Sequence, residues 1–263
     1  MHPILFGDYD LAVLYRQFSG NQFCFQDIIR EEFRLTNLYL TAIKDGAKIL
    51  RIPTQTCLSS HLTLEKLDDR IESIANLCVS NAKKAIENTG SEVLLAGTIG
   101  SVLDFNNREE SDVAKELAEL IIYLADFGVD IFVVQGVSDW EQFSMIITLI
   151  RKLSGAPIAP FFPSKSFNVS FLNNYEELCK NFQLELAGFE FELDEKTIEN
   201  LIVPNIDAPI GLMISNPEAT MEPPLELTRR LIEKVNPTVV LGGANISRRN
   251  WLEIQPLFNG TTL

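Results

Sequence analysis

Histidine and cysteine are scarce in this sequence. Its 263 residues include only two histidines, His2 and His61, and four cysteines. The cysteines are far apart and form no Cys-x-x-Cys pair; they are Cys24, Cys57, Cys78 and Cys179. This spacing argues against a disulfide framework and against a Cys/His zinc cluster. We therefore predict reduced thiols in a cytoplasmic protein that holds no metal and no other cofactor.

Positive charge and long apolar runs are also lacking. The chain has 22 Lys and Arg against 36 Asp and Glu, a formal net charge of −14. A phosphate backbone or an anionic membrane surface attracts basic surfaces, so we expect no nucleic-acid partner and no membrane partner. No segment approaches the roughly 20 apolar residues of a membrane span. The first residues have no basic region and only a short apolar run, so we expect no signal peptide.

Short apolar runs alternate with helical periodicity along the whole chain. The runs are four to eight residues long and mostly lack polar alternation, which is typical of parallel strands covered on both faces. We predict strands near residues 3–7, 47–53, 92–98, 129–135, 157–162, 184–191, 209–215 and 237–242. Eight strands, each followed by a helix, predict a single (β/α)₈ TIM barrel over residues 1–263. A doubly wound open sheet is the alternative.

The segments between the predicted strands have the pattern of amphipathic helices. Apolar residues recur at helical spacing over 71–85 and over 113–124, which places Cys78 in the core. Asp139 with Gln142 three residues later predicts a capping box at the start of the fourth helix. We interpret residues 13–27 and 216–224 as long loops rather than domain boundaries.

The residues that follow each strand line the catalytic face of a (β/α)₈ barrel. Polar side chains occur there after strands from all parts of the chain. We predict a substrate-binding site from Asp8, Thr54, Gln55, Gln135, Glu190, Asn216 and Asn245. The sequence assigns no catalytic residue.

Five segments, in order, resemble the homocysteine S-methyltransferase family. They are Ile4-Leu5-Phe6-Gly7, Asp45-Gly46-Ala47-Lys48-Ile49-Leu50, Leu95-Ala96-Gly97-Thr98-Ile99-Gly100, Phe127-Gly128-Val129-Asp130 with its strand to Gln135, and Val240-Leu241-Gly242-Gly243. The resemblance covers nearly the whole chain, and it implies a (β/α)₈ barrel that binds small metabolites of methyl transfer.

The resemblance fails where that family holds its zinc. The family uses one cysteine after strand six and an adjacent pair after strand eight. Here the first position falls at or beside Phe191, and the pair becomes Ala244 and Asn245. None supplies the thiolate that zinc requires. The family's glutamate after strand four becomes Gln135. An amide both donates and accepts hydrogen bonds, so Gln135 and Asn245 are our strongest candidates for orienting an uncharged polar ligand.

Two acidic pairs have more than one interpretation each. Asp8 and Asp10 follow strand one as an acid/base pair, a cation site or, more simply, a solvated loop. Glu190 and Glu192 alternate with phenylalanines, so either they end the strand in solvent or they mark a site, because buried carboxylates are costly without partners.

Four further features receive weaker functional interpretations. Gly242, Gly243, Arg248 and Arg249, with Ser247 as a helix cap, could cradle a phosphate. A phenylalanine cluster near the barrel mouth is more typical of packing than of a ligand wall; its members are Phe161, Phe162, Phe167 and Phe171. Lys165 lies beyond its strand, which argues against a Schiff-base role, and His61 has no evident partner.

Three functions remain open at this point. The first is a divergent, zinc-free relative of homocysteine methyltransferases that acts on or binds a small metabolite. The second is a catalytically inactive barrel that serves as a binding or assembly partner, with a protein partner or a homo-oligomer. The third is a phosphate-ligand barrel that uses the strand-eight glycines. If the chain is an enzyme, we expect methyl transfer without the usual zinc mechanism.

Overall fold

The protein is described by a computed structural model over residues 5–8, 11, 15, 24–67, 69–163, 169–199, 201, 206, 208–216 and 225–258. The predicted loop 13–27 falls mostly outside this part, and where it is described it ends in a short helix, α2 (Phe25–Arg30). Of the predicted loop 216–224, only its first residue is described.

The strands lie within three residues of their predicted bounds. They are β1 (Leu5–Phe6), β2 (Ile49–Ile52), β3 (Leu94–Ile99), β4 (Ile131–Val134), β5 (Ile158–Pro163), β6 (Ala187–Glu192), β7 (Ile210–Ser215) and β8 (Val239–Gly242). Their order is β1-β8-β7-β6-β5-β4-β3-β2, and every neighbouring pair is parallel. The expected α/β class with a parallel sheet is therefore confirmed.

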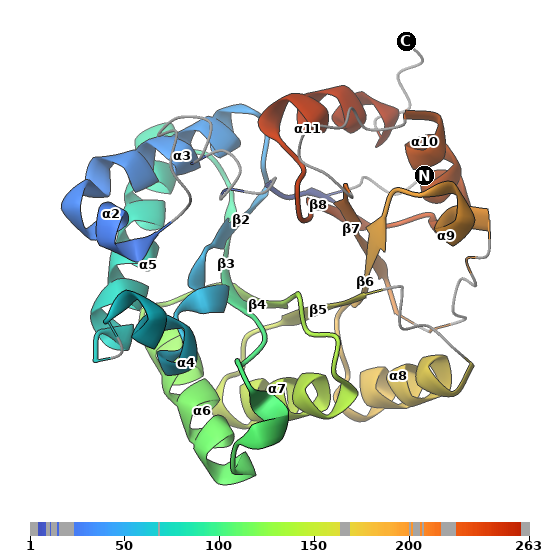
Figure 1. Cartoon of the computed structure of the whole chain (residues 1–263). Helices are drawn as coiled ribbons and strands as arrows, with labels where there is room; N and C mark the ends of the chain where they lie inside the picture. The colour runs from blue at the N-terminus through green and yellow to red at the C-terminus, as the bar shows by residue number, and fades with distance from the viewer. Residues whose placement is uncertain are drawn as a thin grey trace.

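Strands β2 to β8 curl around a common centre, and the helices lie outside the curl (Figure 1). A doubly wound sheet would instead carry helices on both faces. The much shorter β1 pairs with β8 through Leu5 and Phe6. On the other side of this segment, Gly7 forms a single parallel bridge with Ile49 of β2.

Helices follow the strands at the predicted places. Their bounds are α3 (Glu32–Lys44), α4 (Ser59–Leu62), α5 (Ile71–Thr89), α6 (Glu110–Asp126), α7 (Trp140–Leu153), α8 (Val169–Asn181), α9 (Glu195–Glu199), α10 (Leu225–Val235) and α11 (Arg248–Ile254). The capping residue Asp139 accepts a 2.9 Å hydrogen bond from the backbone N–H of Gln142. Ser247 caps α11 in the same way through Asn250. Cys78 is fully buried on α5, as predicted.

Apolar residues pack in two layers separated by the sheet. Because side chains alternate across a strand, residues such as Leu50, Phe132 and Phe189 pack outward against the helices. The residues one position away pack inside the curl as a separate apolar cluster. This inner cluster contains Ile49, Ala96, Val133, Ala159, Phe161, Leu186, Met213 and Leu241.

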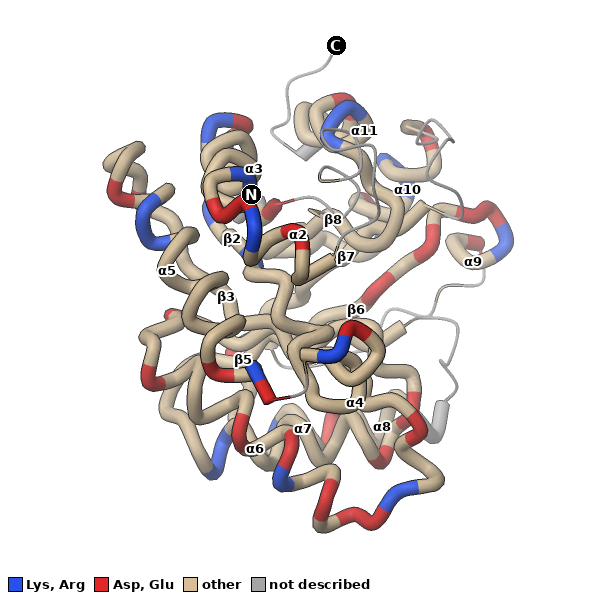
Figure 2. The backbone as a smooth tube through the Cα atoms, turned by 60° about the vertical axis from the view of Figure 1, so that its left-hand side comes forward, with Lys and Arg blue, Asp and Glu red and all other residues tan. Residues whose placement is uncertain are grey.

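Charged residues are distributed mainly over the helices around the sheet (Figure 2). Some acidic and basic side chains on these helices form exposed pairs, such as Lys180 with Glu176. Within the part of the chain that the structure describes, no helix is both long enough and apolar enough to cross a membrane.

Candidate functional site

A cavity of about 270 Å³ opens where the carboxyl ends of the strands meet. It lies directly above the inner apolar cluster, because the strand residues that line it follow that cluster by two positions. Arg51 follows Ile49, Thr98 follows Ala96, and Gln135 follows Val133. The two-residue period of a strand points both members of each pair inward. The inside of the curl thus changes from an apolar layer to a polar one at the cavity.

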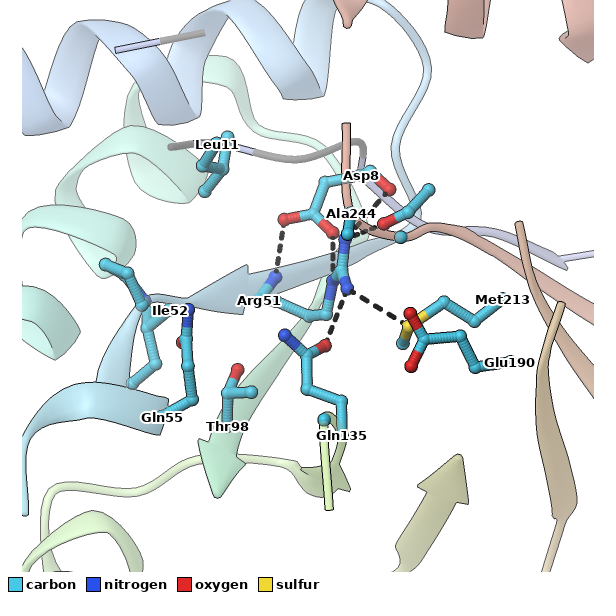
Figure 3. A pocket seen from close by; sticks show the side chains of 14 residues that line it. Asp8, Leu11, Arg51, Ile52, Gln55, Thr98, Gln135, Glu190, Met213 and Ala244 are labelled. Carbon is cyan, nitrogen blue, oxygen red and sulfur yellow. Dashed lines mark hydrogen bonds and ion pairs between the residues drawn. The ribbon is translucent and has the colours of Figure 1, made fainter. Parts of the chain in front are cut away.

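The centre of this polar layer is an ion pair between Asp8 and Arg51 (Figure 3). The Arg51 Nε donates to Asp8 Oδ1 at 2.6 Å, and the backbone N–H of Arg51 donates to Asp8 Oδ2 at 2.9 Å. The Asp8 side chain is fully buried and that of Arg51 is 8% exposed. A charge-assisted pair in this setting interacts strongly, since little water screens it. Asp8 is therefore a buried structural partner, and its interpretation as a residue of a solvated loop was wrong.

The remaining donors of Arg51 join three other parts of the sheet. Nη1 donates to Gln135 Oε1 at 2.7 Å and lies 4.0 Å from the sulfur of Met213. Nη2 donates to the backbone oxygen of Gly242, and it lies 3.4 Å from the backbone oxygen of Asp8. One side chain on β2 thereby connects the ends of β1, β4 and β8.

Thr98 lines the cavity with a hydroxyl that no described residue satisfies. The side chain is 1% exposed, and its Oγ1 has no hydrogen-bond partner within the described ranges. Figure 3 shows Thr98 between Gln55 and Gln135. A buried hydroxyl without a partner is costly, so one directed at a cavity indicates a group that it is placed to meet.

Glu190 brings a second carboxylate to the cavity from β6. Its Oε1 accepts a 2.7 Å hydrogen bond from the hydroxyl of Ser215 on the neighbouring strand β7. The adjacent phenylalanines, Phe189 and Phe191, are buried in the outer layer against the helices. The alternation along β6 thus directs Glu190 inward, which favours the interpretation of this glutamate as part of a site.

Four of the seven predicted site residues meet at this cavity, namely Asp8, Gln55, Gln135 and Glu190. Thr54 does not line it, because its hydroxyl is held by the backbone of Thr98: it donates to the carbonyl at 2.8 Å and accepts from the N–H at 3.0 Å. Thr54 therefore supports the strand on which Thr98 lies.

Asn216 and Asn245 are also absent from the described lining of the cavity. The backbone of Asn245 is left-handed, with φ of 62°, a conformation that asparagine tolerates at turns. Its Nδ2 donates to the backbone oxygen of Asn216 at 3.1 Å. The two residues fasten the β7 and β8 loops to each other, and Asn245 does not join Gln135 in the described lining of the cavity. Ala244 lines the cavity in place of Asn245.

Arg51 is the functional candidate that the sequence analysis missed. A position after a strand does not point to Arg51, because this residue lies within β2, in the segment Ile-Leu-Arg-Ile. The signal was present, because a charged residue inside a strand buried on both faces requires a buried partner. Asp8, at the end of the neighbouring strand, was the available carboxylate.

Several other sequence candidates lie elsewhere. Phe161 is buried in the inner cluster, and Phe162 packs against Phe143 with ring centroids 4.9 Å apart, so neither forms an aromatic wall at the mouth. Asp10, Lys165 and Phe167 fall outside the described residues, as does the side chain of Phe171. His61 has a partner after all: its Nε2 lies 2.8 Å from the backbone oxygen of Ser101.

The arginines proposed for phosphate binding are directed at acidic partners. Arg248 forms two hydrogen bonds with Asp45, at 2.6 and 2.8 Å. Arg249 pairs with Glu253 at 3.1 Å. Neither is among the described residues that line the cavity, so these arginines do not add positive charge to the strand-eight glycines there.

The described residues at the strand ends do not fit zinc. At the positions where the resembling family has cysteines, Phe191 is buried in the outer layer and Ala244 has no ligand atom in its side chain. Among the described residues, no group of three or more His, Cys, Asp or Glu side chains is arranged to hold a metal ion. The Cys57 thiol is also a poor nucleophile, since burial raises its pKa well above the usual value.

Comparisons with known proteins give fold similarity without sequence similarity. No protein-family model matches the sequence, and no curated protein matches it. The metallated form of the homocysteine methyltransferase MmuM from Escherichia coli has a TM-score of 0.76 at 14% identity, covering 97% of this chain and 96% of that chain. Its apo form gives 0.71 at 12% identity, with the same coverage. A putative phosphonomutase from Burkholderia cenocepacia gives 0.51 at 10% identity, over 92% of this chain and 86% of that one. At these identities the likeness shows that the chain has the fold of MmuM, an α/β fold with a curled parallel sheet.

Proposed function

We propose that this chain is a zinc-independent, small-molecule-binding barrel that acts on or binds a small metabolite, as a divergent relative of homocysteine methyltransferases. The observation that carries the proposal is the polar layer of Arg51, Thr98, Gln135 and Glu190 above an apolar floor, open to a cavity. A purely structural interior could continue the apolar packing, which avoids the cost of burying polar groups. The cytoplasmic location is part of this proposal.

The same proposal includes closure of the sheet into a complete (β/α)₈ barrel over residues 1–263. The backbone N–H of Asp8 donates to the oxygen of Ile49 at 3.0 Å, and the N–H of Gly7 donates to the oxygen of Val240 at 2.8 Å. These bonds connect the segment after β1 to β2 on one side and to β8 on the other. They support a continuous hydrogen-bonded ring, in which ligands bind at the carboxyl ends of the strands.

The chemistry available at the cavity is hydrogen bonding and general acid/base chemistry. No thiolate is present there to hold a zinc ion, and a free cysteine-like thiol with a pKa of about 8.5 stays mostly protonated at pH 7. The proposed site therefore holds its ligand through amide, hydroxyl and carboxylate groups. A cavity of about 270 Å³ is near the lower end of ordinary ligand sites, roughly 300–1,000 Å³, which favours a small metabolite over a nucleotide.

The test is a screen of small polar metabolites by thermal shift, followed by calorimetry on the compounds that stabilise the protein. Thr98→Val keeps the shape of the side chain and removes the hydroxyl. We expect it to weaken binding about fivefold to tenfold, the loss of one hydrogen bond at roughly 1 kcal/mol. Thr148→Val makes the same change on the outer helix α7 and should leave binding intact.

Two outcomes would contradict the proposal. The first is that no compound in the screen stabilises the protein, which would favour an inactive barrel that acts as a binding partner. The second is that Thr98→Val and Thr148→Val bind every active compound as the unaltered protein does. In that case the ligands bind away from the cavity.

A further inference from the structure

The side-chain amide of Gln135 has a fixed orientation in the cavity. Its Oε1 accepts a 2.7 Å hydrogen bond from Nη1 of Arg51. Arginine carries N–H donors and no acceptor, so the oxygen of the amide must face it rather than the nitrogen. The amide nitrogen, Nε2, keeps its N–H donors and has no hydrogen-bond partner among the described residues. Gln135 therefore presents donors to the cavity and not an acceptor.

Arg51 strengthens these donors without offering its own charge. Hydrogen bonds that are linked in a low-dielectric interior polarise one another, so a guanidinium that binds Oε1 makes Nε2 of the same amide a better donor. The guanidinium itself is paired with the buried Asp8 at 2.6 Å, and its Nη2 donates to the backbone oxygen of Gly242. An anionic ligand would lose its water without gaining Arg51 as a direct partner, which is costly.

Thr98 lies beside Gln135 on the neighbouring strand. Thr98 of β3 is opposite Val133 of β4, and Gln135 follows Val133 by two positions, so both side chains point inside the curl. The Thr98 side chain is 1% exposed, and its Oγ1 has no partner within the described ranges. Figure 3 shows the amide oxygen of Gln135 toward Arg51 and the amide nitrogen on the side of Thr98 and Gln55. A buried hydroxyl and a set of oriented donors thus share one part of the cavity.

Gln55 reaches this part of the cavity because a short 3₁₀ helix, η1 (Thr54–Thr56), packs against the end of β3. A Cβ on Gly100 would lie 2.7 Å from the backbone oxygen of Gln55 and 2.8 Å from its Cβ. Glycine at this position permits the close approach of the two segments. The apolar side chains of Leu11 and Ile52 also line the cavity, so polar groups and apolar surface are both available to one ligand.

Resting on the proposed function, we propose that the ligand of this cavity is a small uncharged carboxamide, whose carbonyl oxygen accepts from Nε2 of Gln135 and whose N–H donates to Oγ1 of Thr98. A carboxamide carries an acceptor and N–H donors side by side. The acceptor matches the donors that Arg51 orients on Gln135. The N–H supplies the buried hydroxyl of Thr98 with a partner that the described residues do not provide.

Three probes of the same shape test this preference directly. They are butanamide, butanoate and butanamidine, which share a propyl chain and end in a planar group that is neutral, negative or positive. The carboxylate has only acceptors, and the amidinium has only donors. Binding to the full-length protein is followed by NMR of the ¹⁵N-labelled side-chain amides, in which the Gln135 signals are identified by their loss in Gln135→Glu. We expect butanamide to shift these signals and to bind about tenfold more tightly than either charged probe.

Gln135→Glu keeps the shape of the side chain and the acceptor for Arg51, but it replaces the N–H donors by a second acceptor. We expect it to reverse the order, so that butanamidine binds about tenfold more tightly than butanamide. Gln183→Glu is the matched control with the same change in net charge. Gln183 is exposed and precedes β6, at the amino ends of the strands and away from the cavity, so the order of the probes should not change.

The second contact has its own variant. Thr98→Val removes the hydroxyl that accepts from the N–H of the ligand, and it should weaken butanamide binding about fivefold. Thr148→Val on α7 is again the control and should bind butanamide as the unaltered protein does.

The outcomes separate this inference from the proposed function. If a charged probe binds as tightly as butanamide, if Gln135→Glu keeps the original order, or if Thr98→Val binds butanamide normally, the carboxamide assignment is wrong and the cavity remains a binding site. If metabolites from the screen bind at the cavity but butanamide does not, the inference is overturned alone. If neither the screen nor the probes give binding at the cavity, both fail together.

Discussion

Separating Asp8 from Arg51 should be among the most damaging changes in this protein. Asp8→Asn keeps the volume of the side chain but removes its charge and turns one acceptor into a donor. The carboxylate now accepts from both Nε and the backbone N–H of Arg51, and an amide can accept only one of these bonds. Arg51 would be left as a buried cation, with its side chain 8% exposed and without the carboxylate that now pairs with it.

The magnitude follows from burial. Breaking a buried ion pair by removing one partner costs about 3–5 kcal/mol. For a chain of this size, 1 kcal/mol shifts the melting temperature by roughly 2–4 °C, so Asp8→Asn should lower it by roughly 6–20 °C. Arg51→Met should cost a similar amount, because it leaves the carboxylate of Asp8 buried without its cation. The double variant should lose less than the sum, since it buries no unpaired charge.

Urea unfolding followed by circular dichroism gives the unfolding free energies of the unaltered protein, the two single variants and the double variant. The control is Glu253→Gln, which breaks the pair with Arg249, a contact of 3.1 Å whose side chains are 37% and 74% exposed. Exposed pairs of this kind contribute about 0–1 kcal/mol. If Asp8→Asn costs no more than this control, or if the double variant loses the full sum of the singles, the pair is not the anchor that its geometry indicates.

Three more predictions follow from other features. Gly243→Ala should lower the unfolding free energy by roughly 1–3 kcal/mol, because its Cβ would lie 2.1 Å from Ser215 Oγ and 3.1 Å from the backbone oxygen of Ile214; a melting temperature equal to that of the unaltered protein would contradict this. Burial raises the pKa of the Cys179 thiol from 9.0 to about 12, so its contribution to stability is fully present below about pH 9 and is lost as the pH rises toward 12. Cys179→Ala should accordingly flatten the loss of stability over that interval, and identical pH profiles for the two proteins would refute the assignment. Finally, a strong chelator should leave the melting temperature unchanged, and methyl transfer to homocysteine should not appear when zinc is added; zinc-dependent turnover or unfolding by the chelator would show that a metal site exists.

The positions of the strands could be predicted because their physical signal is local. Parallel strands covered on both faces read as short apolar runs, and segments such as 131–134 and 239–242 have no other plausible interpretation between amphipathic helices. The inward direction of Gln135 and Glu190 also follows from local information, since alternate residues of a strand point to the same face of the sheet, here called strand parity.

The errors concern residues whose roles depend on contacts between distant segments. Asp8 looks like a loop residue until the fold places it against Arg51, 43 positions later in the sequence. Asn245 follows a strand, as site residues do, but a left-handed backbone turns its side chain toward Asn216. Position after a strand is therefore a weaker guide than the combination of strand parity with a buried charge.

The bonds around Arg51 also bear on how the chain matures during synthesis. Asp8 and Arg51 lie near its beginning, yet Arg51 donates to the backbone oxygen of Gly242, and the backbone N–H of Gly242 donates to the oxygen of Asp8 at 2.9 Å. In a nascent chain that lacks β8, this charge pair would lack its two hydrogen bonds with the backbone of Gly242. Proteins emerge from the ribosome beginning with the N-terminus, so we expect protease resistance in the first third of this chain to arise only after its last strand has been released.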